Sequence, residues 1–296
     1  MNTLLQGLRQ GLELGSIFAL MALGYSMVYG IVKMINFAHS EFITIGAFAA
    51  YFTTESLLKT ALGNSIWTLI IGLIVSIIVC IVIAIITERF AYRPLRKKGS
   101  SRITALITAI GVSYILKDVI SIIEPNKQYF YAFVSDKESV FYIAIITTAV
   151  LLILLTFFVK KTKTGIAMRA VAENEQAAKL MGINSNFIVS LTFVIGSALA
   201  AIGVVIYLLD VESFSFKIGS VDIGLYPFVA AVIGGIGSLP GAVIGGLLIG
   251  IIKGITEVYS DLGLSDWTDT IIYGIFVIIL LFKPSGLLGK DTKEKV

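Results

Sequence analysis

The feature of this sequence that most restricts its fold is a series of apolar runs, each about as long as a membrane is thick. Residues 140–159 and 187–209 contain no charged side chain at all. A helix of about 20 apolar residues spans the hydrocarbon core of a bilayer. Because lipid cannot hydrogen-bond to the backbone, only helices and closed barrels cross it, and barrel strands would show short alternating segments instead. We therefore expect an all-α, polytopic integral membrane protein.

The proportion of charged residues supports the same conclusion. Asp, Glu, Lys and Arg make up 14% of the 296 residues, and soluble domains average about 25%. We expect one transmembrane domain over residues 1–296, with eight to nine membrane-inserted segments in a lipid bilayer. The net charge of +4 comes from loops and forms no basic patch on a soluble fold, so we do not expect nucleic-acid binding.

Basic residues indicate which loops face the cytoplasm, because short cytoplasmic loops are rich in Lys and Arg. One basic stretch follows the predicted span 66–86, and a second, from Lys160 to Lys163, follows the span 140–159. An even number of crossings separates them, so the two assignments agree. We also expect the tail beyond Lys283 to be cytoplasmic, the N-terminus to be outside, and residues 4–31 to be a retained helix rather than a cleaved signal peptide.

The longest polar interruption, residues 160–186, is expected to be an ordered cytoplasmic loop. Asn174 is a good helix N-cap, and Gly182 is a typical helix stop, so we predict a short helix over residues 175–181. Its side chains mix charge with apolar residues. An ordered, partly apolar helix outside the bilayer suggests docking onto another protein.

Two further stretches are candidates for the translocation path. Residues 225–252 are rich in glycine, and we expect two helices, 225–236 and 242–257, that meet near Pro240. Such broken helices in a membrane either pack densely or line a wet path. The second stretch holds Asn36, His39 and Glu41 near the start of an apolar segment. We favour a capping role for it at the cytoplasmic rim, with a place in a cavity as the alternative.

Three stretches resemble one known family. The run 175–182, EQAAKLMG, resembles the EAA-type cytoplasmic loop of ABC importer permeases, and 165–172, GIAMRAVA, resembles its form in branched-chain amino acid permeases. Residues 24–30 together with 35–39 resemble the N-terminal pattern of the same family, although Ser40 stands where the family usually has glycine. Residues 231–246 resemble its C-terminal pattern. The three stretches occur in the family's order over nearly the whole chain.

The resemblance implies a permease subunit of an importer for branched-chain amino acids in a bacterial-type cell membrane. Its expected partners are separate ABC ATPase subunits, a second and commonly different permease subunit, and an extracytoplasmic substrate-binding protein. The residues expected to couple to the ATPase are Glu175, Ala177, Ala178, Leu180, Met181 and Gly182. Those proposed for the translocation path are Asn36, His39, Gly234, Gly235, Gly237 and Pro240.

Motifs for catalysis are missing from the sequence. It has one His and one Cys, too few for a Cys/His metal cluster, and no phosphate-binding loop. We therefore expect neither enzyme activity nor a cofactor, and we expect a partner subunit to hydrolyse any ATP. The alternatives are a carrier or channel that works alone and a non-transporting scaffold. The sequence leaves the solute open between branched-chain amino acids, urea, short amides and sugars.

Overall fold

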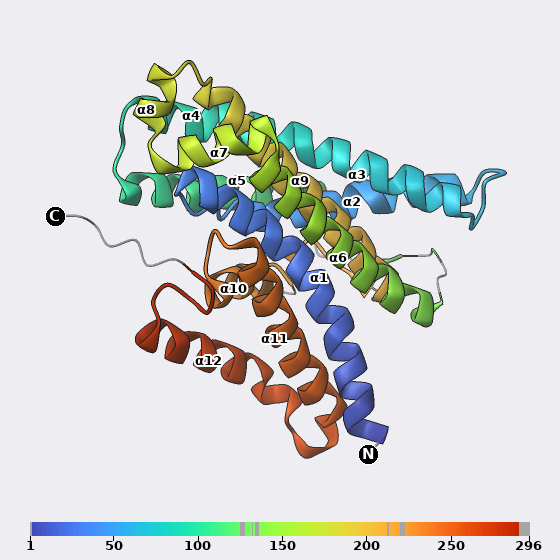
Figure 1. Ribbon diagram of the computed structural model, residues 1–296. Coiled ribbons are helices and arrows are strands. Elements are labelled where there is room, and N and C mark those ends of the chain that lie inside the picture. Colours follow the sequence, from blue (N-terminus) through green and yellow to red (C-terminus); the bar gives the residue numbers. More distant parts are fainter. Residues whose placement is uncertain are drawn as a thin grey trace.

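The computed structural model describes residues 2–124, 128–131, 133, 136–211, 213–219 and 223–289, and it is a bundle of long helices (Figure 1). α10 (Leu225–Gly234) is a short helix, and α3 is extended by a π-helical turn, η1 (Glu88–Tyr92), and a short helix, α4 (Arg93–Lys97). The other helices are α1 (Asn2–Val32), α2 (His39–Leu58), α3 (Ile66–Thr87), α5 (Arg102–Ile123), α6 (Lys137–Lys161), α7 (Lys163–Glu173), α8 (Glu175–Leu180), α9 (Ser185–Asp210), α11 (Leu239–Val258) and α12 (Thr268–Phe282), with 3-10 turns η3 (Ser260–Leu262) and η4 (Ser265–Trp267).

Within the described residues, seven helices are long and apolar enough to cross a membrane. The all-α membrane fold expected from the sequence is therefore confirmed, and the chain is a multi-pass membrane protein. The expected number of eight to nine inserted segments stays a prediction, because α10 is shorter than a full span. Most of the predicted tail, residues 290–296, lies outside the described residues.

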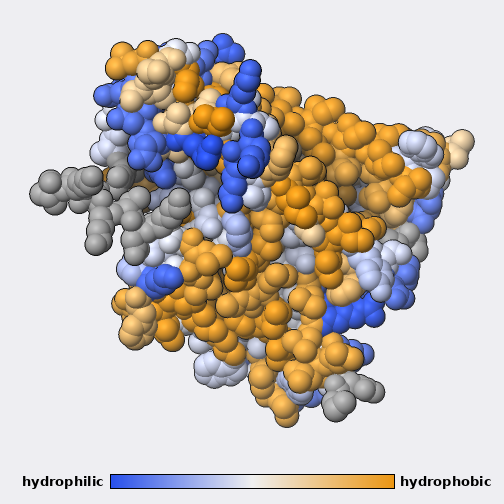
Figure 2. All heavy atoms as spheres, viewed as in Figure 1, coloured by the Kyte–Doolittle hydropathy of each residue, from blue (hydrophilic) through white to orange (hydrophobic). Residues whose placement is uncertain are grey.

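The outer surface of the bundle is apolar over most of its height. Side chains of α3 such as Ile74 and Ile78 are about half exposed, and those of α5 and α12 are largely exposed as well. Figure 2 shows this apolar surface as a broad orange area, with hydrophilic side chains gathered over α4, α7 and α8. Because water would not stabilise so much exposed hydrocarbon, these faces are suited to lipid or to a membrane-embedded partner.

The core of the bundle is a seam between α1 and α11, which pack backbone to backbone. A methyl group on Gly11 would lie 2.6 Å from Cα of Ile251, and one on Gly250 would lie 2.2 Å from Cα of Gly15. Real side chains do not come so close, so only glycine fits at these positions. Small residues let membrane helices approach in this way.

After α9 the chain turns back into the protein as irregular backbone. A two-stranded antiparallel ribbon, β1 (Tyr129–Phe130) with β2 (Ser213–Phe214), lies at the start of this return. Further along the chain, the Gly219 N–H donates a hydrogen bond to Thr44 Oγ1 of α2 at 3.1 Å. Protein encloses this backbone, which is the condition for non-helical chain at membrane depth. α10 and α11 run antiparallel to each other, with Gly245 against Ala230 and Gly241 against Gly234.

The basic stretch after α3 differs from the loop expected there. η1 and α4 continue α3 as helix, and only residues 98–101 form the turn into α5. Pro94 lies in the first turn of α4, directly after the π-helical turn. The basic residues, which we expected in a short loop, therefore lie mostly on helix.

Candidate functional site

α8 is a short helix whose ends are fixed by its own sequence. The Asn174 side chain accepts hydrogen bonds from the N–H groups of Gln176 and Ala177, each at 3.0 Å. At the other end Gly182 has φ +81°, and the Ile183 N–H donates to the Ala178 carbonyl at 3.0 Å. These contacts satisfy backbone groups that a helix end leaves free. The predicted cap and stop are confirmed, and the helix ends one residue earlier than predicted.

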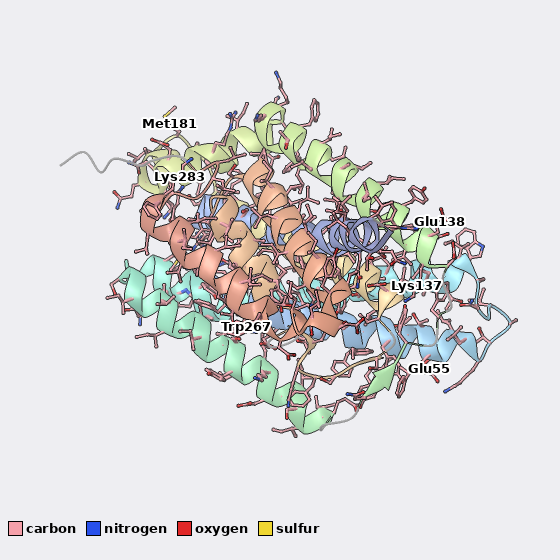
Figure 3. The ribbon with its side chains drawn as sticks, turned by 90° about the horizontal axis from the view of Figure 1, so that it is seen from below. Glu55, Lys137, Glu138, Met181, Trp267 and Lys283 are labelled. Atoms are coloured by element: carbon pink, nitrogen blue, oxygen red, sulfur yellow. The ribbon has the colours of Figure 1, made fainter. Side chains whose placement is uncertain are left out.

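The six residues predicted to couple to an ATPase divide into two faces of α8. Ala178 is 3% exposed and packs against the protein, whereas Leu180 is 89% exposed and Met181 is 82% exposed. Ala177 and Gly182 are exposed as well. Figure 3 shows Met181 toward the same end of the molecule as Lys283, away from Lys137 and Glu138. The outward face of α8 is therefore an apolar tip at the hydrophilic end of the bundle.

Glu175 points toward the protein's own basic stretch. Its carboxylate lies 2.8 Å from Lys179 Nζ and 3.6 Å from Nη1 of Arg96 in α4. The loop 160–186 and the basic stretch after α3 thus meet at one end of the bundle. The sequence assigned both to the cytoplasmic side from separate charge patterns, and their contact agrees with that assignment.

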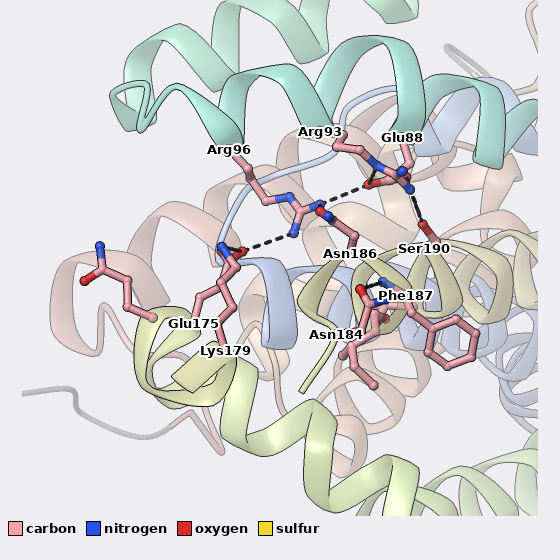
Figure 4. A network of polar contacts seen from close by, with 12 residues as sticks. Glu88, Arg93, Arg96, Glu175, Lys179, Asn184, Asn186, Phe187 and Ser190 are labelled. Carbon is pink, nitrogen blue, oxygen red and sulfur yellow. Dashed lines mark hydrogen bonds and ion pairs between the residues drawn. The ribbon is translucent and has the colours of Figure 1, made fainter. Parts of the chain in front are cut away.

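Beneath this contact lies a buried carboxylate that the sequence analysis did not single out (Figure 4). The side chain of Glu88 has no exposed area. It accepts hydrogen bonds from Arg93 Nη2 at 2.8 Å, Arg96 Nη2 at 3.0 Å and Ser190 Oγ at 2.9 Å. The cluster therefore joins η1 and α4 to α9. Losing one member of such a buried charge pair typically costs about 3–5 kcal/mol, because the other charge stays buried and unpaired.

The π-helical turn makes this cluster possible. In an α-helix, residues five apart are rotated about 140° from each other around the axis. In a π-helix the hydrogen bonds join residues five apart, and the Arg93 N–H donates to the Glu88 carbonyl. Arg93 and Glu88 therefore share one face. The sequence does show an acidic residue, Glu88, before a basic stretch. However, the five-residue spacing of Glu88 and Arg93 would not pair them in an α-helix.

The structure places Asn36 and His39 in the interior. Asn36 is 3% exposed, and its side-chain oxygen accepts a hydrogen bond from Tyr92 Oη of η1 at 2.7 Å. His39 is 1% exposed; its ring centroid lies 4.3 Å from that of Tyr25, and a methyl group on Gly24 would lie 2.7 Å from the histidine ring.

The favoured capping role for these residues was wrong. The N-cap of α2 is Ala38, and no side chain caps this helix. The chain turns at Lys33, with φ +57°, and carries Asn36 into the core. There the hydroxyl of Tyr92, which is distant in the sequence, donates a hydrogen bond to the side-chain oxygen of Asn36. In an N-cap that oxygen would instead accept from a backbone N–H of the helix.

The glycine-rich break is packed inside the protein. Gly235 and Gly237 have φ of +105° and +92°, so the turn uses conformations that glycine adopts most readily. Residues near the end of the chain cover it, since the Leu288 N–H donates to the Gly234 carbonyl at 2.8 Å. Pro240 lies in the first turn of α11, after the break and not at it. A break was predicted correctly. It was expected near Pro240, whereas the structure has it at residues 235–238, two to five residues earlier.

Comparison with known proteins decides the family. The family model described as "Branched-chain amino acid transport system / permease component" matches residues 7–281. The chain belongs to this family. The permease is 38% identical to the high-affinity branched-chain amino acid transport system permease protein BraD of Pseudomonas aeruginosa, over 99% of this chain and 98% of BraD.

Two further relatives agree with that assignment. The permease is 35% identical to the high-affinity branched-chain amino acid transport system permease protein LivH of Escherichia coli, over 99% of this chain and 97% of LivH. It is 30% identical to the probable branched-chain amino acid transport permease protein LivM of Methanocaldococcus jannaschii, over 53% of this chain and 49% of LivM. No solved structure matched the permease significantly.

Proposed function

We propose that this chain is the transmembrane permease subunit of an ABC importer for leucine, isoleucine and valine, driven by a separate ATPase subunit. The observation that carries the proposal is α8, an ordered helix at the hydrophilic end of the bundle with exposed Leu180 and Met181 at its tip. The family and the names of BraD and LivH support the solute class.

The two faces of α8 suit a helix that packs against its own protein on one side and binds a partner protein on the other. Ala178 packs inward, and Glu175 is tied to Arg96. Leu180, Met181 and Ala177 face outward, where they are free to enter a cleft of an ATPase. Exposed apolar side chains amid charged ones are typical of protein interfaces. Glu175 and Gly182 then serve the coupling by orienting and ending the helix.

In this proposal α8 acts as the lever of a two-state cycle. ATP closes the ATPase dimer, α8 moves with it, and the permease changes between an outward-open and an inward-open state. A ligand shifts such an equilibrium only by binding one state better than the other. ATP inside and the loaded extracytoplasmic binding protein outside would provide this difference. A second permease subunit would complete the path, to which we assign Asn36, His39, Gly234, Gly235, Gly237 and Pro240.

The coupling role is tested by replacing the tip of α8. In the double variant Leu180→Glu/Met181→Glu we expect the ATPase to no longer co-purify and leucine uptake to be lost, because two charges would enter an apolar cleft. The matched control is Leu262→Glu in η3, which is 72% exposed at the other end of the bundle. Unchanged co-purification and uptake in the double variant would reject the coupling role.

The solute and the alternative mechanism need separate tests. Binding of radiolabelled leucine to the cognate extracytoplasmic receptor, and its absence for urea, short amides and sugars, would support the solute class. The second candidate is a carrier or channel that works alone. Uptake of leucine by the purified permease in liposomes without any ATPase would favour that candidate and contradict the importer.

A further inference from the structure

A series of polar contacts, interrupted only by the backbone of η1, leads from α8 to the start of α2. It begins at Glu175, passes through Arg96 to Glu88, and crosses η1 from its first residue to its last, Tyr92. Tyr92 Oη then donates to Asn36. At the hydrophilic end of the bundle, side-chain contacts therefore join α8, α4, η1 and the connection between α1 and α2.

Arg96 is the member of this series that joins the two charged groups. Its side chain is 8% exposed, and Nη2 lies 3.0 Å from Glu88 Oε1. Nη1 lies 3.6 Å from Glu175 Oε1 and makes no hydrogen bond within the part of the chain that the structure describes. That separation is slightly longer than a hydrogen bond. A small approach of α8 would close this contact, and a small retreat would break it.

The element between Arg96 and Asn36 is suited to a change of shape. η1 is a π-helical turn inside an otherwise α-helical rod, and such turns are frequent at functional sites. Its first residue, Glu88, is held by Arg96, and its last, Tyr92, is held against Asn36. A pull on Arg96 therefore acts on one end of the turn, and the other end is fixed to the connection between α1 and α2.

The far end of the series lies at a place where movement would matter. Asn36 belongs to residues 33–38, which turn at Lys33 and lead into α2. His39, the first residue of α2, lies against Tyr25 and Gly24 of α1. A displacement of Asn36 would thus change the packing of α1 and α2 in the interior, well beneath the surface that α8 offers to a partner.

We propose that Arg96 is a positioning residue that transmits the movement of α8 through the π-helical turn to the α1–α2 connection. This inference rests on the proposed function, since it requires an ATPase that moves α8. It adds a route that does not follow the chain, because α8 is covalently joined to α9 and not to α3. The contact at Glu175 is the input, and the hydrogen bond between Tyr92 and Asn36 is the output.

The experiment uses the complete transporter in liposomes, with its ATPase, second permease and binding protein. Leucine uptake and ATP hydrolysis are measured in the same vesicles. For Arg96→Gln we expect ATPase binding and hydrolysis to be kept, while the leucine moved per ATP falls about fivefold or more, the range of typical coupling energies. Lys97→Gln is the matched control, since it removes an exposed positive charge from the same helix and should leave the ratio unchanged.

A second variant keeps the proposal testable if Arg96→Gln does not assemble. Tyr92→Phe removes one oxygen from the output contact, and we expect it to lower leucine moved per ATP as well. The combined variant should be no worse than the more severe single one, because both interrupt one route. Wild-type ratios in Tyr92→Phe, or effects that multiply, would overturn the route. Failure of the unmodified permease to bind an ATPase would instead overturn the proposed function.

Discussion

Two regions of this permease are held together in opposite ways. The α1–α11 seam contains glycine backbones in direct contact, with Gly250 against Gly15. The inner end, where α4, α8 and α9 meet, is joined by charges around Glu88 and Arg96. Close packing has one arrangement and resists displacement. Ion pairs at 2.8–3.6 Å tolerate small movements and can be exchanged between partners. The comparison assigns rigidity to the seam and movement to the inner end.

The largest effect is expected from a large side chain placed in the seam. Gly250→Leu should abolish accumulation of the permease in the membrane, because even a methyl group at this position would lie 2.2 Å from Gly15 Cα. Gly274→Leu in α12 is the control, since a methyl group there meets nothing within 4 Å. Membrane levels and thermal stability in detergent measure the effect. Equal levels of the two variants would show that the seam is not the rigid part.

The charged inner end should respond less severely. Glu88→Gln should lower the free energy of unfolding by about 3 kcal/mol, because Arg93 and Arg96 would lose their shared counter-charge in a buried site. The variant should still insert and remain helical, and it should lose stability mainly at the inner end. Thermal unfolding and local protease sensitivity near α4 and α8 give the measurement. Stability equal to that of the wild type would mean that the cluster carries no structural energy.

The smallest expected effect concerns α8 itself. Asn174→Ala removes the acceptor of the Gln176 and Ala177 N–H groups and should cost about 1 kcal/mol, the usual value of an N-cap. Because the rest of the fold does not depend on this cap, the loss should appear as faster amide exchange in α8 with unchanged global unfolding. Asn184→Ala, which removes the corresponding cap of α9, is the comparison variant. Loss of global stability in Asn174→Ala would show that α8 is not a separate local unit.

Local sequence patterns were enough to predict the membrane class, the helical spans and the ends of α8. Each depends on neighbouring residues: apolar runs of spanning length, Asn174 before the helix, and Gly182 after it. The turn between α10 and α11 was also predictable, because Gly235 and Gly237 allow backbone conformations that other residues disfavour. These features need no knowledge of the rest of the chain.

The pairing of distant polar groups, in contrast, depends on how the helices pack. The hydrogen bond of Asn36 with Tyr92 joins residues 56 positions apart, and that of Glu88 with Ser190 joins residues 102 positions apart. A π-helical turn, which no local sequence pattern predicted, brings Glu88 and Arg93 to one face of the helix. The physical reason is that burial forces a polar group to find a partner, whereas the identity of that partner depends on which helices pack together.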